Sequence, residues 1–397
     1  MKVTLLGLGG GTPDTLTVQT RRVLDESEVI LGAQRLLDAL PESCTPQRIS
    51  AVTAKEILSQ LQKLDRAQAA VVFSGDSGFY SGARLLLPLL EENGFETEVL
   101  PGLSSVQLLA ARLGRPWQDW RLVSAHGVDC DAVAEVMGDK PVFFLTGGTQ
   151  GPAELCCQLV RAGLGDLEAT VGENLSLPGE KIIIGTAEKL MGERFVPLSV
   201  LLAESAPLMP QRTHGWPDGW FIRGRTPMTK QFVRAAALAK LAVEPNDICW
   251  DVGAGTGSVS VELSALSRRV YAVEQDGEAC SLIRQNREKF HAWNLTLIEG
   301  RAPAALEGLP KPDAVFIGGS DGELPAIIAS ALGKNPHVRL CVSAIALETL
   351  HTAVSAMTAR GIETSVTQIA VSRTKAAGEL HLLTANNPVF LITGNCP

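Results

Sequence analysis

The sequence of 397 residues predicts an α/β protein made of two unlike halves, and three observations support this prediction. Short apolar runs alternate with segments of helical periodicity through most of the chain, which is typical of α/β layers with parallel strand pairing. In the second half, the glycine loop Gly253-Ala-Gly-Thr-Gly257 follows one of these runs. Between the halves, residues 206–227 lose all periodicity. We therefore expect one domain over 1–205, a linker or folded-over lid over 206–222, and a second domain over 223–397.

Composition indicates a globular protein and excludes several other classes. The chain is 45% hydrophobic and 20% charged, and its formal net charge of −8 argues against a broad nucleic-acid surface. No apolar run approaches ~18 residues, and the glycine-rich start does not resemble a signal peptide, so we expect a cytoplasmic protein with no membrane span. The eight cysteines include no C-x-x-C pair, and no metal site is expected.

The first half is expected to form strands connected mostly by helices. Strands are predicted at Val3–Leu6, Val29–Leu31, Ala69–Ser74, Glu96–Leu100, Leu122–Ser124, Val142–Leu145, Thr170–Glu173 and Leu198–Ala203. Helices are predicted from about Thr17 and at Ala83–Glu92, Val106–Leu113 and Ala153–Ala162. The loops after four strands are rich in small residues: Gly7–Gly11, Gly75–Gly78, Pro101–Ser105 and Gly147–Gly148. Ligands of open α/β sheets bind at such carboxyl ends, so four loops on one edge favour a binding site, although any one of them is an ordinary turn.

The second half shows the same alternation and then a different tail. Helices are predicted at Lys230–Leu241, Val259–Leu266, Ala279–Phe290 and Ala346–Ala359, with strands at Ile248–Trp250, Val270–Val273, Leu295–Ile298, Asp313–Ile317 and Val338–Val342. The segments Ile362–Ser372 and Pro388–Thr393 are predicted to pair as a hairpin that closes the sheet. An α/β run that ends in an antiparallel hairpin is more typical of a nucleoside-dependent methyltransferase than of a dehydrogenase.

The glycine loop of the second half indicates the kind of ligand. Glu274 ends the next apolar run, seventeen residues beyond Gly257, where its carboxylate can accept both hydroxyls of a ribose. A dinucleotide site prefers the spacing G-x-G-x-x-G. Here the spacing is G-x-G-x-G, which favours an adenosyl sulfonium, with a nicotinamide nucleotide or a purely structural turn as alternatives.

A basic segment precedes this loop. Between residues 206 and 234 one acid, Asp218, stands against five bases, Arg212, Arg223, Arg225, Lys230 and Arg234, which is a local excess of +4. Arginine forks grip carboxylates in a bidentate manner, so the segment is predicted to clamp an anionic substrate. A solvated hinge is the alternative.

The second half contains Arg223-Gly-x-x-Pro227-Met-Thr-Lys230, Trp250 to Ser258, Gly300-Arg-Ala-Pro303, Asp313 to Ser320 and Asn387-Pro-Val389. On these residues it resembles the decarboxylating precorrin or cobalt-precorrin methyltransferases of cobalamin synthesis. The first half resembles the tetrapyrrole methylase family, on the Gly7–Gly11 loop, Ser74 to Tyr80, Pro101 to Ser105 with Gln107, Ala111 to Gly114, and Asn174-Leu-Ser176. Fusion in this order resembles the bifunctional enzymes that methylate C5 and C15 of precorrin-6B. The resemblance implies a two-lobed class III fold followed by a doubly wound, Rossmann-like class I methyltransferase.

The resemblance also implies the ligands and the residues that bind them. It implies two S-adenosylmethionine sites per chain, a reduced tetrapyrrole substrate and assembly into a homo-oligomer. The second domain would methylate C15 and release carbon dioxide from the ring-C acetate, and the first would methylate C5. The implied donor-binding residues are Gly75, Asp76, Ser104 and Ser105 in the first domain, and Thr229, Gly253, Gly255, Thr256, Gly257, Glu274 and Ala302 in the second. Arg223, Arg225, Lys230 and Arg234 would hold the carboxylate arms of the substrate, and no residue is assigned as a catalytic acid or base.

Several positions and functions remain open at this point. Asp76 could instead cap a helix that begins near Ser77. His126 could contact substrate, although a hydrogen-bonded loop histidine is the simpler interpretation. Two positions depart from the family patterns: Gly10 stands where proline is common, and Arg301 stands where an acid often accepts the adenine amino group. The alternatives are the same reactions on a cobalt-precorrin, a nicotinamide-dependent tetrapyrrole oxidoreductase, a nucleic-acid methyltransferase and a tetrapyrrole carrier.

Overall fold

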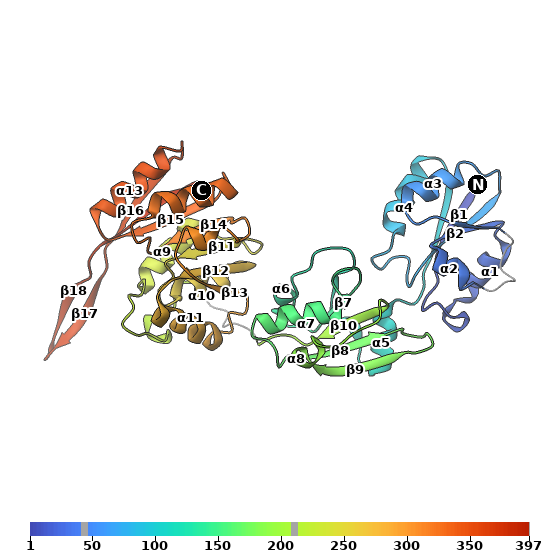
Figure 1. Cartoon of the computed structure of the whole chain (residues 1–397), viewed down its shortest axis with the longest axis horizontal. Coiled ribbons are helices and arrows are strands. Elements are labelled where there is room, and N and C mark those ends of the chain that lie inside the picture. Colours follow the sequence, from blue (N-terminus) through green and yellow to red (C-terminus); the bar gives the residue numbers. More distant parts are fainter. Residues whose placement is uncertain (41–46, 208–212, 397) are drawn as a thin grey trace. The chain divides into compact units, whose positions relative to one another are not determined.

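The computed structural model describes residues 1–40, 47–207 and 213–396, and it separates into two compact units, Met1–Ala206 and Pro207–Pro397 (Figure 1). Each unit has its own sheets and its own buried core. Among the described residues, no helix has both the length and the apolar character needed to cross a membrane.

The first unit begins with a five-stranded parallel sheet of order β3-β2-β4-β1-β5. Its strands are β1 (Lys2–Gly7), β2 (Val29–Gly32), β3 (Gln47–Ser50), β4 (Gln68–Phe73) and β5 (Glu96–Leu100). Its helices are α1 (Val18–Glu26), α2 (Gln34–Asp38), α3 (Ala54–Leu61) and α4 (Ala83–Glu92), with a short 3-10 turn η1 (Pro13–Thr15). Neighbouring residues of β1 point to opposite faces: Leu5 packs in the core under α3 and α4, and Leu6 in the core under α1 and α2. This sheet confirms the prediction of parallel α/β layers.

The second sheet of the first unit is mixed, with the order β6-β7-β10-β8-β9. Its strands are β6 (Arg121–Ser124), β7 (Val142–Leu145), β8 (Glu168–Glu173), β9 (Lys181–Thr186) and β10 (Ser199–Ala203). Its helices are α5 (Ser105–Leu113), α6 (Ala132–Val136), α7 (Pro152–Arg161) and α8 (Ala187–Leu190), with the 3-10 turn η2 (Trp117–Asp119). Only β6 and β7 pair in parallel, so the parallel prediction was wrong for the other pairs of this sheet. The turn between β8 and β9 is too short for the crossover that parallel strands require.

The second unit is built on a seven-stranded sheet of order β13-β12-β11-β14-β15-β19-β16. Its strands are β11 (Ile248–Val252), β12 (Arg269–Glu274), β13 (Leu295–Glu299), β14 (Ala314–Ile317), β15 (Arg339–Ala344), β16 (Thr364–Ile369) and β19 (Val389–Gly394). Its helices are α9 (Gln231–Leu241), α10 (Ser258–Ser264), α11 (Gly277–Lys289), α12 (Leu324–Lys334) and α13 (Leu347–Thr358), with 3-10 turns η3 (Asp218–Trp220) and η4 (Ala304–Leu306). One core lies under α9, α10 and α11 and the other under α12 and α13. The sheet is therefore doubly wound, as predicted.

The predicted closing hairpin forms, because β19 pairs antiparallel with both β15 and β16. The sequence patterns did not predict what lies between its strands: a second hairpin of β17 (Ser372–Ala377) and β18 (Leu380–Ala385), which projects from the unit (Figure 1). All of its residues are exposed.

The predicted linker, 206–222, is only partly a connection. Residues 208–212, and with them the predicted clamp residue Arg212, lie outside the described residues. From Trp216 onward the segment is built into the second unit, since Trp216 is 2% exposed and its ring centroid lies 5.2 Å from that of Phe290. Burial of these aromatic rings packs this part of the basic segment against the core of the second unit.

Candidate active sites

In the first unit, three glycine-bearing loops meet at the carboxyl edge of the parallel sheet; we call Gly7–Gly11, Gly75–Gly78 and Pro101–Ser105 the N-terminal loop cluster. Gly9 and Gly75 exchange two backbone hydrogen bonds of 3.0 Å. A Cβ on Gly102 would lie 2.3 Å from the carbonyl oxygen of Gly75, so this approach requires glycine. The predicted convergence is confirmed for these three loops. Gly147–Gly148 follows β7 of the other sheet and does not join them.

Asp76 holds two of these loops together. Its Oδ1 accepts a hydrogen bond of 2.9 Å from the backbone N–H of Gly78, and its Oδ2 accepts one of 3.0 Å from Gly102. The alternative in which Asp76 caps a helix near Ser77 is wrong, because the next helix begins at Ala83. The carboxylate thus fixes the loops that a donor would contact.

Ser104 and Ser105 start helix α5 beside this carboxylate. Ser104 is 3% exposed, and its hydroxyl and backbone N–H both bond to the Gln107 side chain in a capping box. The Ser104 side chain therefore organises the helix start, while Ser105 is half-buried in its first turn. The Cα of Ser104 would lie 3.9 Å from a Cβ on Gly75, which brings all four predicted residues of this unit into one place.

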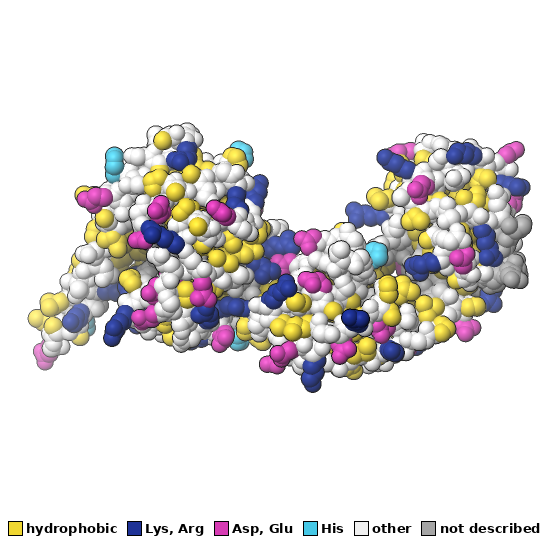
Figure 2. All heavy atoms as spheres, in the orientation of Figure 1, with side chains coloured by type: hydrophobic (Ala, Val, Ile, Leu, Met, Phe, Trp, Pro, Cys, Tyr) yellow, Lys and Arg dark blue, Asp and Glu magenta, His cyan; other side chains and the backbone are white. Residues whose placement is uncertain are grey.

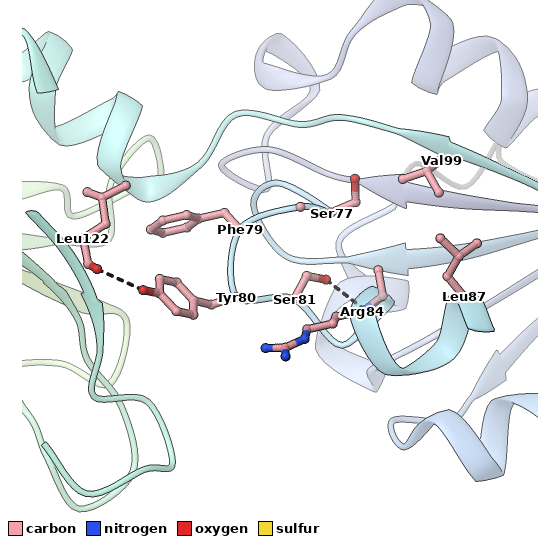
Figure 3. Close-up of a pocket in the computed structure, with 10 residues that line it drawn as sticks. Ser77, Phe79, Tyr80, Ser81, Arg84, Leu87, Val99 and Leu122 are labelled. Atoms are coloured by element: carbon pink, nitrogen blue, oxygen red, sulfur yellow. Dashed lines mark hydrogen bonds between the residues drawn. The ribbon is translucent and has the colours of Figure 1, made fainter. Parts of the chain in front are cut away.

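A cavity of about 540 Å³ lies beside the Gly75–Gly78 loop (Figure 3). Its lining is mainly apolar and aromatic, with one cation from α4, and includes Phe79, Tyr80, Arg84, Leu87, Val99 and Leu122. The Tyr80 hydroxyl, from the loop between β4 and α4, donates a hydrogen bond of 3.0 Å to the carbonyl of Leu122 in strand β6 of the other sheet. The cavity is thus bounded by both lobes of the first unit.

In the second unit, the loop between β11 and α10 has a backbone that demands glycine. Gly253, Gly255 and Gly257 have φ of +67°, +57° and +74°. A Cβ on Gly253 would lie 2.4 Å from the carbonyl oxygen of Gly319 in the loop after β14. A Cβ on Gly255 would lie 3.0 Å from the carbonyl oxygen of Pro227 in the basic segment. We call Thr226–Pro227, Gly253–Gly257, Glu274 and Gly318–Gly319 the C-terminal loop cluster.

Glu274 joins the end of β12 to this loop. Its Oε2 accepts a hydrogen bond of 2.8 Å from the N–H of Gly255, and its Oε1 accepts bonds from the N–H groups of Gln275 and Asp276. A carboxylate has about four lone-pair sites, so the half-buried group retains capacity for a ribose hydroxyl. Thr256 and Ala302 lie at the same edge and are almost fully buried, while the carbonyl of Thr229 is held by Arg234.

Asp251 was not among the predicted site residues, although it is the acid two positions before the first glycine of the loop. It is fully buried, its Oδ2 accepts a hydrogen bond from Ser260, and its Oδ1 has no hydrogen-bond partner among the described residues. Burial raises the pKa of the Asp251 carboxyl to about 7 against the Ser260 hydrogen bond, which lowers it, and the charge of Glu274 raises it further. The Thr256 hydroxyl is likewise buried without a partner among those residues.

The four predicted cations of the basic segment divide into two kinds. Arg223, Arg225 and Lys230 are exposed. Arg234 is 0% exposed and pairs with Glu262 at 2.8 Å and Asp218 at 3.0 Å. Its guanidinium also donates to the carbonyls of Trp216 and Thr229. The structure therefore does not bring Arg234 together with the other three at the surface.

Comparison with known proteins identifies both halves. Residues 2–191 match the family described as Tetrapyrrole (Corrin/Porphyrin) Methylases, and residues 220–394 match the family described as Precorrin methyltransferase domain. The chain is 31% identical over 357 residues to a Precorrin-6Y C(5,15)-methyltransferase [decarboxylating] of a Sinorhizobium species, with 86% of this chain and 84% of the relative covered. The chain belongs to this family of two-domain precorrin methyltransferases. The predicted family and fold class are thereby confirmed.

Two further relatives match about half of the chain. A probable cobalt-precorrin-6B C(15)-methyltransferase (decarboxylating) of Pyrobaculum calidifontis is 43% identical over 46% of this chain and 97% of its own length. The crystal structure of a precorrin-6y C5,15-methyltransferase from Geobacter metallireducens GS-15 is 38% identical, with a TM-score of 0.44 over 46% of this chain and 98% of that one. Membership of the family supports a methyltransferase over the oxidoreductase, nucleic-acid methyltransferase and carrier alternatives.

The positions that depart from the family patterns have local explanations. A Cβ on Gly10 would lie 1.7 Å from the Ser176 hydroxyl oxygen. The Ser176 side chain therefore fills the space that a proline side chain at position 10 would need. Arg301 is 54% exposed and pairs with Asp321 at 3.0 Å, in the loop before α12. Nδ1 of His126 lies 3.2 Å from the carbonyl of Thr146, and the residue is a hydrogen-bonded loop histidine.

Proposed function

We propose that this chain transfers methyl groups from S-adenosylmethionine to C5 and C15 of a precorrin-6 ring and removes the carboxylate of its ring-C acetate. The observation that carries the proposal is the presence of a glycine-loop cluster at a sheet edge in each unit, in a chain matched over 86% of its length by a C(5,15)-methyltransferase. We assign C5 to the first unit and C15 with decarboxylation to the second.

The residues of the C-terminal loop cluster suit a positively charged donor. Glu274 of this cluster and the neighbouring Asp251, outside it, place two acidic groups at the ends of adjacent strands, and one Asp251 oxygen and the Thr256 hydroxyl are buried without a partner among the described residues. In the first unit, Gly75, Asp76, Ser104 and Ser105 would hold the donor. When bound, S-adenosylmethionine supplies an electrophilic methyl group at a sulfonium.

Chemistry on the ring needs alignment more than a strong base. Meso carbons of a reduced tetrapyrrole are enamine nucleophiles, so holding one of them in line with a methyl group supplies up to ~7–11 kcal/mol in favourable cases. The electron pair released with carbon dioxide can enter the conjugated macrocycle, and a proton from water then converts the remaining CH2 group into a methyl group, so the chain need only orient the acetate. Arg223, Arg225 and Lys230 are exposed where they can grip carboxylate arms, and buried Arg234 fixes the segment that carries them.

The metal-free precorrin is the favoured substrate, with a cobalt-precorrin as the alternative. The relative that covers both halves is named without cobalt, whereas the relative from Pyrobaculum, which covers one half, is named for a cobalt-precorrin. We place the reaction in the cytoplasm, where thiols stay reduced, since no disulfide joins any of the seven cysteines among the described residues, and Cys44 lies outside them.

The test incubates the full chain with a labelled methyl donor and either the metal-free precorrin or the cobalt-precorrin, and analyses the products by mass spectrometry. The proposal expects a gain of two labelled methyl groups and the loss of one carbon dioxide, and calorimetry should count about two S-adenosylhomocysteine molecules per chain. Glu274→Ala should leave a singly methylated product that retains its acetate, and Asp76→Ala should leave a decarboxylated product methylated only at C15. If Asp76→Ala instead blocked the loss of carbon dioxide, the assignment of reactions to units would be reversed.

We propose further that the chain is a homo-oligomer and that the β17–β18 hairpin packs on a second copy. An isolated two-stranded hairpin is marginal in water, and this one exposes Leu380, Leu382 and Leu383 at 68%, 55% and 75%. Hydrophobic side chains are visible on the projecting hairpin in Figure 2. Light scattering should give a mass above that of one chain, and the double change Leu380→Ser and Leu382→Ser should lower it. A parent chain that elutes and scatters as a monomer would end this part of the proposal.

A further inference from the structure

The β17–β18 hairpin starts at the edge of the second-unit sheet that carries the loop Gly253–Gly257, and we call this edge the donor edge. Because β19 is antiparallel to both β15 and β16, the carboxyl end of β16 lies at the same edge as the carboxyl end of β15. The parallel strands β11, β14 and β15 also end there, next to the loop Gly253–Gly257. Arg373, the second residue of β17, therefore leaves the sheet on the side where ligands of doubly wound folds bind.

The start of helix α9 lies at this edge as well. The last residue of α9, Leu241, accepts a hydrogen bond of 3.1 Å from the side chain of Arg339, which begins β15 at the opposite edge of the sheet. A helix rises about 1.5 Å per residue, so the 11 residues of α9 carry its first turn back across the sheet to the donor edge. Phe232 belongs to this first turn and is 49% exposed.

Arg373 and Phe232 meet at the surface. The guanidinium carbon of Arg373 lies 5.4 Å from the centroid of the Phe232 ring, in a cation–π contact. Arg373 also lies 3.8 Å from Oδ2 of Asp218, with 48% of its side chain exposed. Asp218 is already engaged through Oδ1, by the N–H of Gln231 and by Arg234. A long ion pair to a shared carboxylate leaves most of the five N–H donors of Arg373 available to a ligand.

The cations at the donor edge lie on both sides of the glycine loop. The backbone N–H of Arg225 donates 3.0 Å to Glu278 in the first turn of α11, the helix that follows β12. Arg373 comes from the strand after β16, and β12 and β16 lie on opposite sides of β11 in the sheet. A ring with carboxylate arms around its rim needs contacts on two sides of the reacting carbon before its orientation is fixed.

We infer that Phe232 and Arg373 form a second substrate-contact site in the C15 half-reaction, in which Arg373 binds a carboxylate arm of the tetrapyrrole and the Phe232 ring packs beside that arm. The inference rests on the proposed function, because it names how the proposed substrate is oriented. It adds a hairpin outside the family glycine motifs to the substrate-binding surface.

The test uses the full chain and three single variants: Arg373→Ala, Phe232→Ala and the control Lys375→Ala. Lys375 suits the control because it is an exposed cation two residues along the same strand and on the same hairpin face. Two readouts are needed: the KM of the precorrin for C15 methylation, and the Kd of uroporphyrin, an air-stable tetrapyrrole octacarboxylate, by tryptophan quenching. Arg373→Ala and Phe232→Ala should each raise the KM and the Kd about tenfold, which corresponds to ~1.4 kcal/mol. Lys375→Ala should leave both constants within about twofold of the parent chain.

Affinity for S-adenosylhomocysteine and the C5 reaction should not change in these variants. The inference is overturned if Arg373→Ala leaves KM and uroporphyrin binding within about twofold of the parent chain, or if Lys375→Ala weakens them equally. A loss confined to preparations whose mass in light scattering has also fallen overturns it too, and assigns Arg373 to assembly. Failure of the parent chain to methylate C15 would instead remove the proposed function, and the uroporphyrin series would still decide the role of Arg373.

Discussion

The two units hold glycine loops at the edge of a parallel sheet by different physical means. In the N-terminal loop cluster the loops contact one another directly: Gly9 and Gly75 exchange backbone hydrogen bonds, and Gly102 packs closely against Gly75. The Asp76 carboxylate accepts a hydrogen bond from the next loop. In the C-terminal loop cluster, buried and half-buried charges connect the loops to helices, through Glu274 and the Arg234–Glu262 pair. Both clusters also contain a close backbone approach, since a Cβ on Gly253 would lie 2.4 Å from the carbonyl oxygen of Gly319. Both should therefore respond to added volume, whereas the second should respond more strongly to the removal of charge.

The largest effect is expected from Arg234→Met. Because Glu262 would remain fully buried without its cation, and half-buried Asp218 would keep its long ion pair with Arg373, the free energy of unfolding of the second unit should fall by about 3–5 kcal/mol. Denaturant unfolding followed by tryptophan fluorescence measures this, and the control is Arg115→Met in the first unit, whose pair with Glu204 is about two-fifths exposed on the arginine side. The control should lose less than about 1 kcal/mol. Equal losses in the two variants would contradict the contrast between the units.

Added volume tests the close backbone approach that holds the loops of the first cluster together. Gly102→Ala puts a Cβ 2.3 Å from the carbonyl oxygen of Gly75, and backbone cannot move aside cheaply, so a loss of about 3 kcal/mol is expected in the first unit. Gly75→Ala is the matched control, since its nearest neighbour would be 3.9 Å away and only its φ of +70° is unfavourable. That variant should lose about 1–2 kcal/mol. Similar stabilities of the two variants would show that the loops are not held by close approach.

A third test uses the buried carboxyl of the second unit. The pKa of Asp251 is raised to about 7 in the folded chain, from an ordinary value of 3.8. Below pH ~4 the carboxyl is protonated in both states; as the pH rises to ~7, the unfolded chain loses this proton first, so the stability of the second unit falls. Between pH 5 and pH 8 the loss should be on the order of 2–3 kcal/mol and should be absent in Asp251→Asn. Unfolding curves at the two pH values measure it, and equal pH dependence in both proteins would exclude Asp251 as the cause.

The sequence was sufficient for the features that depend on local pattern. Apolar periodicity located most strands of the parallel sheet in the first unit and of the seven-stranded sheet in the second, and the motif spacing located Gly253–Gly257 and Glu274 at one edge. The sequence was insufficient for features that depend on packing between residues far apart in the chain. The exposed hairpin β17–β18 has no distinctive apolar pattern, and the burial of Arg234 depends on Asp218 and Glu262, which lie 16 and 28 residues away. A count of charges therefore placed Arg234 with the exposed cations, and the buried Asp251, within the matched motif, went unassigned. Helix α12 was missed although its buried residues Leu324, Ile327, Ile328 and Ala331 repeat at helical spacing.

The smallest expected effect separates the two carboxylates that organise the clusters. Asp76→Asn and Glu274→Gln keep the size of each side chain but replace one acceptor oxygen by an NH2 group that cannot accept the backbone N–H. Each should weaken one S-adenosylhomocysteine site by about five- to tenfold, or roughly 1 kcal/mol, and leave the other site unchanged. Calorimetry on the full chain resolves the two sites if they differ in affinity, and Asp14→Asn, at an exposed acid of η1, is the control. Glu274→Gln should have the larger effect, because its carboxylate accepts three backbone N–H groups and is proposed to accept a ribose hydroxyl of the donor, whereas Asp76 accepts two and links the loops. The reverse order would mean that the first unit, too, binds its donor through charge.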